Sequence, residues 1–210
     1  MAELKAGCYI KIKNNLKKEN FMIVTIGISN RHVHLTKDDL EFLFGKNYEL
    51  KELKKINQPG QYAAMEKVII EGPKGRIDNV RILGPVRNYT QVEISKTDAY
   101  KLGINPPIRD SGDLTDSETV EIIGPVNKIT RKCCIIANRH IHITKQQKQE
   151  LNLENLEEVA VSFEGEKGLI FDHVKLKECT EAELELHLDT DDANAGFLKT
   201  GNIGRIIKKQ

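Results

Sequence analysis

Short stretches of alternating hydrophobic and polar residues, many of them closed by a Gly-Pro turn, run along most of the chain. A period of two places alternate side chains on one face of a strand, so each stretch predicts a strand with one buried face. Counted with their turns, these stretches span residues 23–26, 58–63, 67–73, 80–87, 90–94, 119–123, 158–163, 168–171, 174–176 and 182–188. Many short strands separated by Gly and Pro are typical of a small β-barrel or sandwich.

Capping residues predict a few short helices between these strands. Thr36 precedes Asp39 by three residues, and Thr144 precedes Gln147 by the same spacing. A hydroxyl at the N-cap accepts the backbone N–H three residues on, so both threonines predict helix starts. A third short helix is predicted over residues 97–102. The first and third helices are expected to end at glycines, Gly45 and Gly103.

The chain contains an internal repeat. Residues 30–36, Asn-Arg-His-Val-His-Leu-Thr, recur 108 positions later as Asn-Arg-His-Ile-His-Ile-Thr at 138–144. Two histidines one residue apart on a strand share a face, which lets them offer two nitrogens to one metal ion. A single copy is equally compatible with two satisfied histidines on a half-exposed strand. The duplication favours metal binding, because four of the six histidines of the chain lie in these two stretches.

A third ligand is predicted in each half by a second alignment. Residues 92–99 align without a gap on residues 186–193, which places Glu93 on His187. Three protein ligands with one open position are typical of catalytic zinc, whereas structural zinc sites are closed by four ligands rich in Cys. The hypothesis is therefore two metal sites with three ligands each, His32, His34 and Glu93, and His140, His142 and His187.

The same alignment shows an asymmetry, because Arg87 in the first half corresponds to Glu181 in the second. A guanidinium six residues before Glu93 lies on the same strand or the turn before it, where it can bind an oxyanion through two hydrogen bonds. The alternative is a surface arginine after a Gly-Pro turn. Three further polar residues in loops are candidates for substrate binding, although such residues more often close a turn. They are Gln58, Ser111 and Asn194.

Composition narrows the function classes. The 32 basic and 31 acidic residues nearly cancel, and Trp is absent, so neither a nucleic acid nor a membrane surface is an expected partner. No apolar run reaches the length of a spanning helix. The cysteines lack C-x-x-C spacing and are expected to be free thiols in a reducing cytoplasm. They are Cys8, Cys133, Cys134 and Cys179.

Three segments are expected along the chain of 210 residues. Residues 1–22 form an N-terminal extension, which is Lys-rich, lacks a secretory signal and is best interpreted as a leader. Residues 23–127 and 128–210 form two duplicated small β-barrels capped by short helices. The predicted fold is thus mainly β, with the metal sites near the junction of the barrels.

The longer motifs resemble those of a known family, the PduL-type phosphate propanoyltransferases, over about residues 24–205. The resemblance rests on the two His-x-His stretches, on Gly84-Pro85-Val86-Arg87 followed by Gln91-Val92-Glu93-Ile94-Ser95, and on Arg109-Asp110-Ser111-Gly112. It implies a phosphotransacylase that reversibly converts propanoyl-CoA, or a similar short-chain acyl-CoA, and phosphate into acyl phosphate and coenzyme A. It also implies two zinc ions between two helix-capped barrels, a homodimer or larger assembly, and a link to propanediol degradation.

The resemblance also assigns roles to residues. It places the family's metal ligands on the six residues of the two hypothetical sites, and the phosphate-handling arginine on Arg87. Gln58, Ser111 and Asn194 match polar positions near the site. The reaction implied is direct attack of phosphate on the thioester, with metal-assisted charge stabilisation and no acyl-enzyme. Some members enter bacterial microcompartments through an amphipathic N-terminal helix, and the leader here is about the right length but a poor amphipath.

Three other functions remain open at this stage. His-x-His with a later Glu or His also suits a metal-dependent hydrolase or oxygenase on a cupin-like barrel. An acyl-CoA thioesterase differs from a transferase only in using water in place of phosphate. A non-catalytic scaffold with structural zinc ions would carry the same ligand residues.

Overall fold

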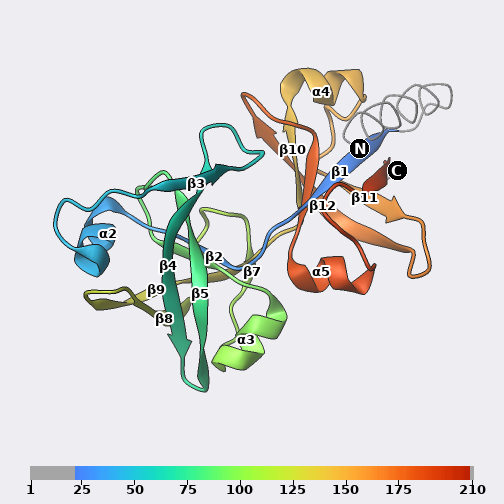
Figure 1. Cartoon of the computed structure of the whole chain (residues 1–210). Helices are drawn as coiled ribbons and strands as arrows, with labels where there is room; N and C mark the ends of the chain where they lie inside the picture. The colour runs from blue at the N-terminus through green and yellow to red at the C-terminus, as the bar shows by residue number, and fades with distance from the viewer. Residues whose placement is uncertain (1–21, 209–210) are drawn as a thin grey trace, which may run out of the picture.

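The computed structural model describes residues 22–208, and the leader predicted for residues 1–21 lies outside them. The chain folds into two closed six-stranded β-barrels that lie side by side, each accompanied by short helices (Figure 1). This confirms the predicted class, a mainly β fold of two barrels with short α-helices. No helix in this part of the chain is long and apolar enough to cross a membrane.

Barrel 1 closes through the strand order β2-β5-β4-β8-β9-β6. Two further short strands extend it, β3 alongside β4 and β7 alongside β9. Its strands are β2 (His32–His34), β3 (Glu52–Lys55), β4 (Tyr62–Gly72), β5 (Gly75–Gly84), β6 (Gln91–Glu93), β7 (Ile108–Arg109), β8 (Glu118–Ile123) and β9 (Lys128–Ala137).

Barrel 2 closes through the order β1-β13-β10-β12-β11-β14. Its strands are β1 (Ile23–Ile28), β10 (His140–Thr144), β11 (Glu158–Phe163), β12 (Leu169–Cys179), β13 (Glu185–Leu188) and β14 (Ile203–Ile207). The strands predicted at 168–171 and 174–176 are one continuous strand, β12, in which His173 has a φ of 52°. Strands β3, β7 and β14 had no prediction.

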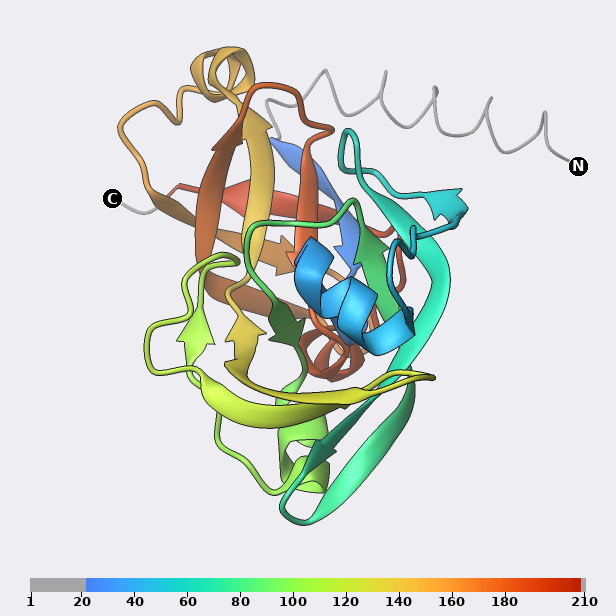
Figure 2. The same ribbon diagram turned by 90° about the vertical axis from the view of Figure 1, so that its left-hand side faces the viewer.

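The two barrels exchange one strand. Each His-x-His strand pairs in parallel with one neighbour and antiparallel with the other, in the same way in both barrels. β1, which precedes the first His-x-His strand, lies in barrel 2 beside β13, whereas β9, which precedes the second, lies in barrel 1 beside β6. Figure 2 shows blue β1 among the orange and red strands. The predicted division at 127/128 separates the sequence repeats, and each barrel takes one strand from across it.

Each barrel has its own hydrophobic core. The exchanged strands are part of these cores, since Ile26 of β1 and Cys134 of β9 are both fully buried, in barrels 2 and 1 respectively. Burial of one Ile side chain stabilises a fold by roughly 1.5–3 kcal/mol, so β1 is held by its apolar face as well as its hydrogen bonds. The described cysteines are free thiols, as predicted. Burial raises the pKa of the Cys133 thiol to about 12, which excludes it as a nucleophile at neutral pH.

Helix caps follow the sequence closely. Helix α2 (Lys37–Phe44) has Thr36 at its N-cap, and α4 (Lys145–Glu150) begins with a capping box formed by Thr144 and Gln147. Helix α3 (Lys96–Leu102) ends at Gly103 as predicted, but it starts one residue earlier because Ser95 is the cap. Helix α5 (Thr190–Ala195), capped by Asp189, follows β13 as α3 follows β6 and had no prediction.

The arginine of each repeated motif ties its strand to one of these helices. Arg31 forms an ion pair with Asp98 of α3 at 2.7 Å, and Arg139 forms the equivalent pair with Asp192 of α5 at 2.9 Å. The aspartate in each pair occupies the same place relative to the third candidate ligand. The repeat Asn-Arg-His-x-His therefore includes a structural anchor as well as the histidines.

Candidate functional site

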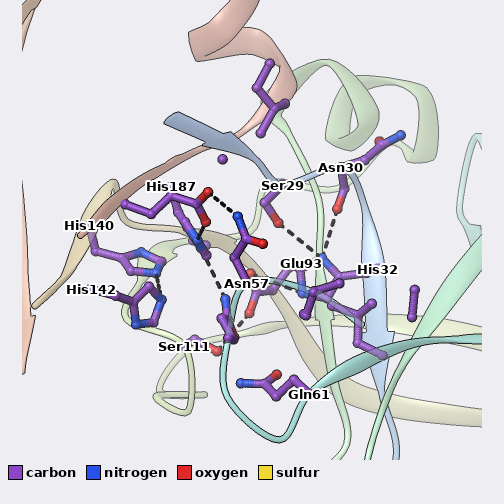
Figure 3. Close-up of a pocket in the computed structure, with 18 of the residues that line it drawn as sticks. Ser29, Asn30, His32, Asn57, Gln61, Glu93, Ser111, His140, His142 and His187 are labelled. Carbon is purple, nitrogen blue, oxygen red and sulfur yellow. Dashed lines mark hydrogen bonds and ion pairs between the residues drawn. The ribbon is translucent and has the colours of Figure 1, made fainter. Parts of the chain in front are cut away.

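A cavity of about 680 Å³ lies between the two barrels and is lined by residues from both. All six residues of the two hypothetical metal sites are in or beside it. In Figure 3, His140, His142 and His187 lie on one side of the view, His32 and Glu93 on the other, with Asn57 between them. The candidate metal ligands of both sites therefore lie at the junction of the barrels.

Site 1 consists of His32 and His34 of β2 and Glu93 of β6. The antiparallel register places His32 directly opposite Glu93, and one ligand atom of each residue lies within 4.8 Å of the others. All three residues are buried. The ring of His32 donates Nδ1–H to the Asn30 carbonyl at 2.8 Å, which leaves its Nε2 facing a Glu93 carboxylate oxygen at 3.5 Å.

Site 2 consists of His140 and His142 of β10 and His187 of β13. Here His140 is directly opposite His187, so the ungapped alignment of Glu93 with His187 corresponds to the strand registers of the structure. His140 donates Nδ1–H to the Asn138 carbonyl at 2.8 Å, and its Nε2 lies 3.1 Å from Nε2 of His142. At that distance two imidazole nitrogens either share one proton or converge on one cation.

A neutral amide and a hydroxyl hold the carboxylate of site 1. Glu93 Oε1 accepts hydrogen bonds from Gln91 Nε2 at 2.6 Å and from Ser111 Oγ at 2.8 Å. The Gln91 side chain is fully buried and also accepts the backbone N–H of Gly112. Ser111, a predicted substrate-binding residue, thus contacts a candidate ligand directly.

A loop of barrel 1 reaches across to site 2. Gln58 Nε2 lies 3.2 Å from His187 Nδ1, while the other ring nitrogen of His187 lies 2.8 Å from Glu185 Oε2. The second oxygen of Glu185 accepts a hydrogen bond from Asn57 at 2.8 Å. Both contacts join residues more than 120 positions apart, and Gln58 lines the cavity.

Arg87 lines the cavity, and no carboxylate in the described part of the chain pairs with its charge. Its guanidinium donates to Gln61 Oε1 and to the Tyr89 hydroxyl, each at 2.9 Å, and both acceptors are neutral. Its backbone N–H is held by the Leu35 carbonyl at 2.8 Å. Glu181, which the alignment matched to Arg87, also lines the cavity, so the predicted asymmetry of charge exists within one pocket.

Asn194 is the one candidate that lies away from the cavity. It is exposed on α5 and is absent from the cavity lining. Its backbone carbonyl accepts the N–H groups of Gly196 and Phe197, which close the end of the helix. Its side chain is exposed to solvent, and its backbone helps to end the helix.

Burial keeps most of the clustered histidines neutral. It lowers the pKa of His140 to about 4 and those of His34 and His142 to about 3, with neighbouring histidines adding to each shift. For His32, burial acts in the same direction, but the facing Glu93 carboxylate outweighs it and raises the pKa. Burial by itself would raise the pKa of Glu93, whereas His32 lowers it on balance.

The donor sets fit a divalent cation. Zinc takes neutral imidazole nitrogens and carboxylate oxygens, and the pKa shifts of His34, His140, His142 and Glu93 favour these states, with His32 as the exception. A second observation points the same way, because His34 Nδ1 is buried without a hydrogen-bond partner in the described structure. A buried ring nitrogen without a partner is costly unless another group completes the site.

The neutral histidines predict an acid-sensitive fold in the presence of a chelator. A buried histidine whose pKa lies below its ordinary 6.5 binds fewer protons when folded, so stability is lost as the pH falls from 6.5 towards 4. At pH 5, His34 and His140 each lower the free energy of unfolding by about 2 kcal/mol. His32, with a raised pKa, offsets part of this.

Urea unfolding of the chelated protein at pH 7, 6 and 5 measures this loss, expected to be about 2 kcal/mol or more overall. In His140→Gln, the free energy of unfolding should fall less steeply between pH 7 and pH 5, by the contribution of one histidine. An unfolding free energy that stays flat from pH 7 to pH 5 would contradict the assigned protonation states.

Several site residues escaped the sequence analysis. Gln91 and Glu185 each stand two residues before a candidate ligand, so the alternation of the strand already places them on its face. Asn57 and Gln61 come from a loop whose contacts have no local signal. Cys179 Sγ lies 3.3 Å from His142 Nδ1, a contact made across neighbouring strands.

The fold and the cavity together place this chain in a class of proteins with two β-barrels, in which two sets of candidate metal ligands line one cavity between the barrels. Residues 25–199 match the family model described as phosphate propanoyltransferase. The chain is 51% identical over 195 residues to the phosphate propanoyltransferase of Thermotoga maritima, covering 92% of each chain. It is 44% identical to that of Rhodopseudomonas palustris, over 89% of this chain and 83% of the other, and 41% identical to that of Clostridioides difficile, over 95% of both. The chain belongs to the phosphate propanoyltransferase family and is an acyltransferase.

Proposed function

We propose that this protein transfers a short acyl group, propanoyl or one of similar length, between coenzyme A and phosphate in a reversible reaction. The observation that carries the proposal is the position of Arg87. A guanidinium hydrogen-bonded only to neutral groups lines the same cavity as both ligand groups. Family membership supplies the reaction class, and an unpaired cation in the cavity supplies a place for the phosphate.

Two zinc ions are proposed at the two groups, one held by His32, His34 and Glu93, the other by His140, His142 and His187. Bound zinc would supply Lewis-acid stabilisation for the negative charge that develops on the thioester oxygen and on the departing sulfur. The protein side chains keep the donors in the right protonation state. Asn30 and Asn138 fix the Nδ1–H tautomers of His32 and His140 through their carbonyls.

Arg87 is proposed to hold the phosphate and to orient one of its oxygens towards the thioester carbon. That oxygen forms the new carbon–oxygen bond, the carbon–sulfur bond breaks, and coenzyme A leaves as a thiolate that is later protonated. Bringing the two substrates together in this orientation lowers the entropic part of the barrier. Gln61 and Tyr89 keep the guanidinium in place without neutralising it. Ser111 and Gln58 are proposed to affect the reaction through Glu93 and His187, which they contact.

Two features of the cellular setting remain proposals. The resemblance implies a homodimer or larger assembly in the cytoplasm, either free or inside a bacterial microcompartment. The residues that would decide between free and enclosed forms are those of the leader, outside the described part of the chain. No nucleic acid or membrane partner is proposed.

The function is tested by measuring release of free CoA thiol from acetyl-, propanoyl- and butanoyl-CoA. Each assay is run with and without phosphate, then repeated after a chelator and after zinc is restored. We expect phosphate-dependent release that the chelator abolishes and zinc restores, with propanoyl-CoA or a close homologue as the best substrate. The cause of the loss is removal of the charge stabilisation at both sites.

The other outcomes identify the rival functions. Thiol release at the same rate without phosphate would show a thioesterase. Release that persists after complete removal of metal would refute the metal-assisted mechanism, and no release with any acyl group would favour a scaffold with structural metal ions.

A further inference from the structure

Gln91 and Glu185 occupy equivalent positions in the two barrels but differ in charge. Each stands two residues before the third candidate ligand, Glu93 in site 1 and His187 in site 2. In site 1 the neutral amide of Gln91 donates to the carboxylate of Glu93. In site 2 the carboxylate of Glu185 faces the imidazole of His187. Each site therefore contains one carboxylate, as a ligand in site 1 and behind a ligand in site 2.

This difference balances the charge of the two sites. A divalent ion held by two neutral histidines and Glu93 leaves a net charge of +1, whereas three neutral histidines leave +2. Glu185 restores +1 at site 2 without occupying a ligand position. Such a carboxylate behind a metal-ligating histidine fixes the ring tautomer and makes the ligand more basic.

The backbone beside Glu185 leaves room for its carboxylate. Gly27 of β1 pairs with His187, and a Cβ at this position would lie 2.6 Å from Glu185 Oε2. In barrel 1 the equivalent place, opposite Glu93, is taken by Ile135. Gly27 does not have a positive φ, so its backbone conformation does not call for glycine, but a side chain here would displace the Glu185 carboxylate from its place beside His187.

Both carboxylate oxygens of Glu185 are used, and the residue is only 6% exposed. Oε2 lies 2.8 Å from His187 Nε2, and Oε1 accepts the amide of Asn57 from the loop of barrel 1. Because a carboxylate can only accept, the proton of the neutral imidazole lies on Nε2 and its lone pair on Nδ1. Nδ1 lies 3.2 Å from Gln58 Nε2, and both residues line the cavity, so a metal ion bound at Nδ1 would take the place of this contact.

We infer that Glu185 is the positioning residue of site 2, which orients His187 for metal binding and sets the charge of that site. The inference rests on the proposed function in one respect, namely that site 2 holds a metal ion. The backbone gap at Gly27 and the anchor at Asn57 support this role, because they serve the carboxylate and not the imidazole itself.

The test is a zinc titration of the full-length protein against a chromophoric chelator. For Glu185→Gln we expect one of two sites to weaken by about 10- to 100-fold while the other keeps its affinity. Gly27→Ala, which leaves Glu185 in place but crowds its carboxylate, should weaken the same site. Glu183→Gln makes the same chemical change at an exposed residue two positions earlier and should keep both affinities.

A second measurement follows His187 without metal. Long-range ¹⁵N–¹H NMR of the chelated protein should show the proton of His187 on Nε2, and Glu185→Gln should weaken that preference. If both zinc sites of Glu185→Gln keep the affinities of the wild type, the inference about Glu185 is overturned and the proposed function is not. A wild-type protein that binds no zinc would overturn the metal-assisted function as well, whereas phosphate-independent turnover with a weakened second site would overturn only the transferase proposal.

Discussion

Replacing Arg87 by alanine is expected to lower kcat/KM for phosphate about a thousandfold while both metal sites keep their zinc. Removal of one fixed charge that stabilises a developing anion typically costs two to three orders of magnitude, and a phosphate-binding arginine can contribute more. Metal binding should survive because the guanidinium contacts Gln61 and Tyr89 and no candidate ligand. The measurement is steady-state thiol release at varied phosphate, with zinc content determined on the same sample.

Matched variants separate the role of Arg87 from a general loss of positive charge. Arg87→Lys keeps the charge but loses the two-pronged geometry, so it should recover only part of the rate. Arg76→Ala removes an exposed arginine on β5 and should leave the rate unchanged. Activity retained in Arg87→Ala would refute the phosphate role, whereas loss of zinc in that variant would show that the arginine acts on the metal sites.

Replacing a single candidate ligand is expected to halve the zinc content and abolish turnover. For His187→Ala and for Glu93→Ala we expect one zinc ion per chain in place of two and a loss of activity of at least a thousandfold. Each lost ion also removes the stability gained from binding only to the folded state, about 2.7 kcal/mol when free zinc exceeds Kd a hundredfold. Glu93→Ala should lose more stability, because it leaves buried Gln91 without its closest partner.

The measurements are zinc content by mass spectrometry and the melting temperature with and without added zinc. His173→Asn is the matched control, since His173 is an exposed histidine outside both groups and asparagine tolerates its left-handed backbone. It should keep two zinc ions. Full zinc content in His187→Ala, or a melting temperature that rises with zinc as in the wild type, would refute the assignment of site 2.

Repetition within the chain made much of this architecture predictable from one sequence. The two His-x-His stretches follow from strand alternation, and the matching places of Glu93 and His187 follow from an ungapped local alignment, both of which a sequence shows directly. Helix starts at Thr36 and Thr144 were equally visible, because capping is a local interaction.

Contacts that join distant segments were not predictable. β1 reads as an ordinary apolar strand, and nothing in its residues indicates pairing with β13, which is about 160 positions away. The same holds for Asn57 and Gln58, whose partners in barrel 2 follow from the packing of the barrels. Gln91 and Glu185 fall between these cases. Strand alternation places them on the same face as the candidate ligands, but it does not indicate their hydrogen-bond partners.

The exchange of β1 and β9 has a consequence for how such a molecule arises. One repeat alone cannot close a barrel, because its opening strand belongs to its neighbour. Two identical copies of one repeat would close both barrels only together, as an intertwined dimer with a twofold axis through the shared cavity. The present chain has the strand arrangement of such a dimer with its two copies joined end to end. In a single chain the two halves need not be identical, and they differ within the cavity at the pairs Glu93 and His187, Gln91 and Glu185, and Arg87 and Glu181.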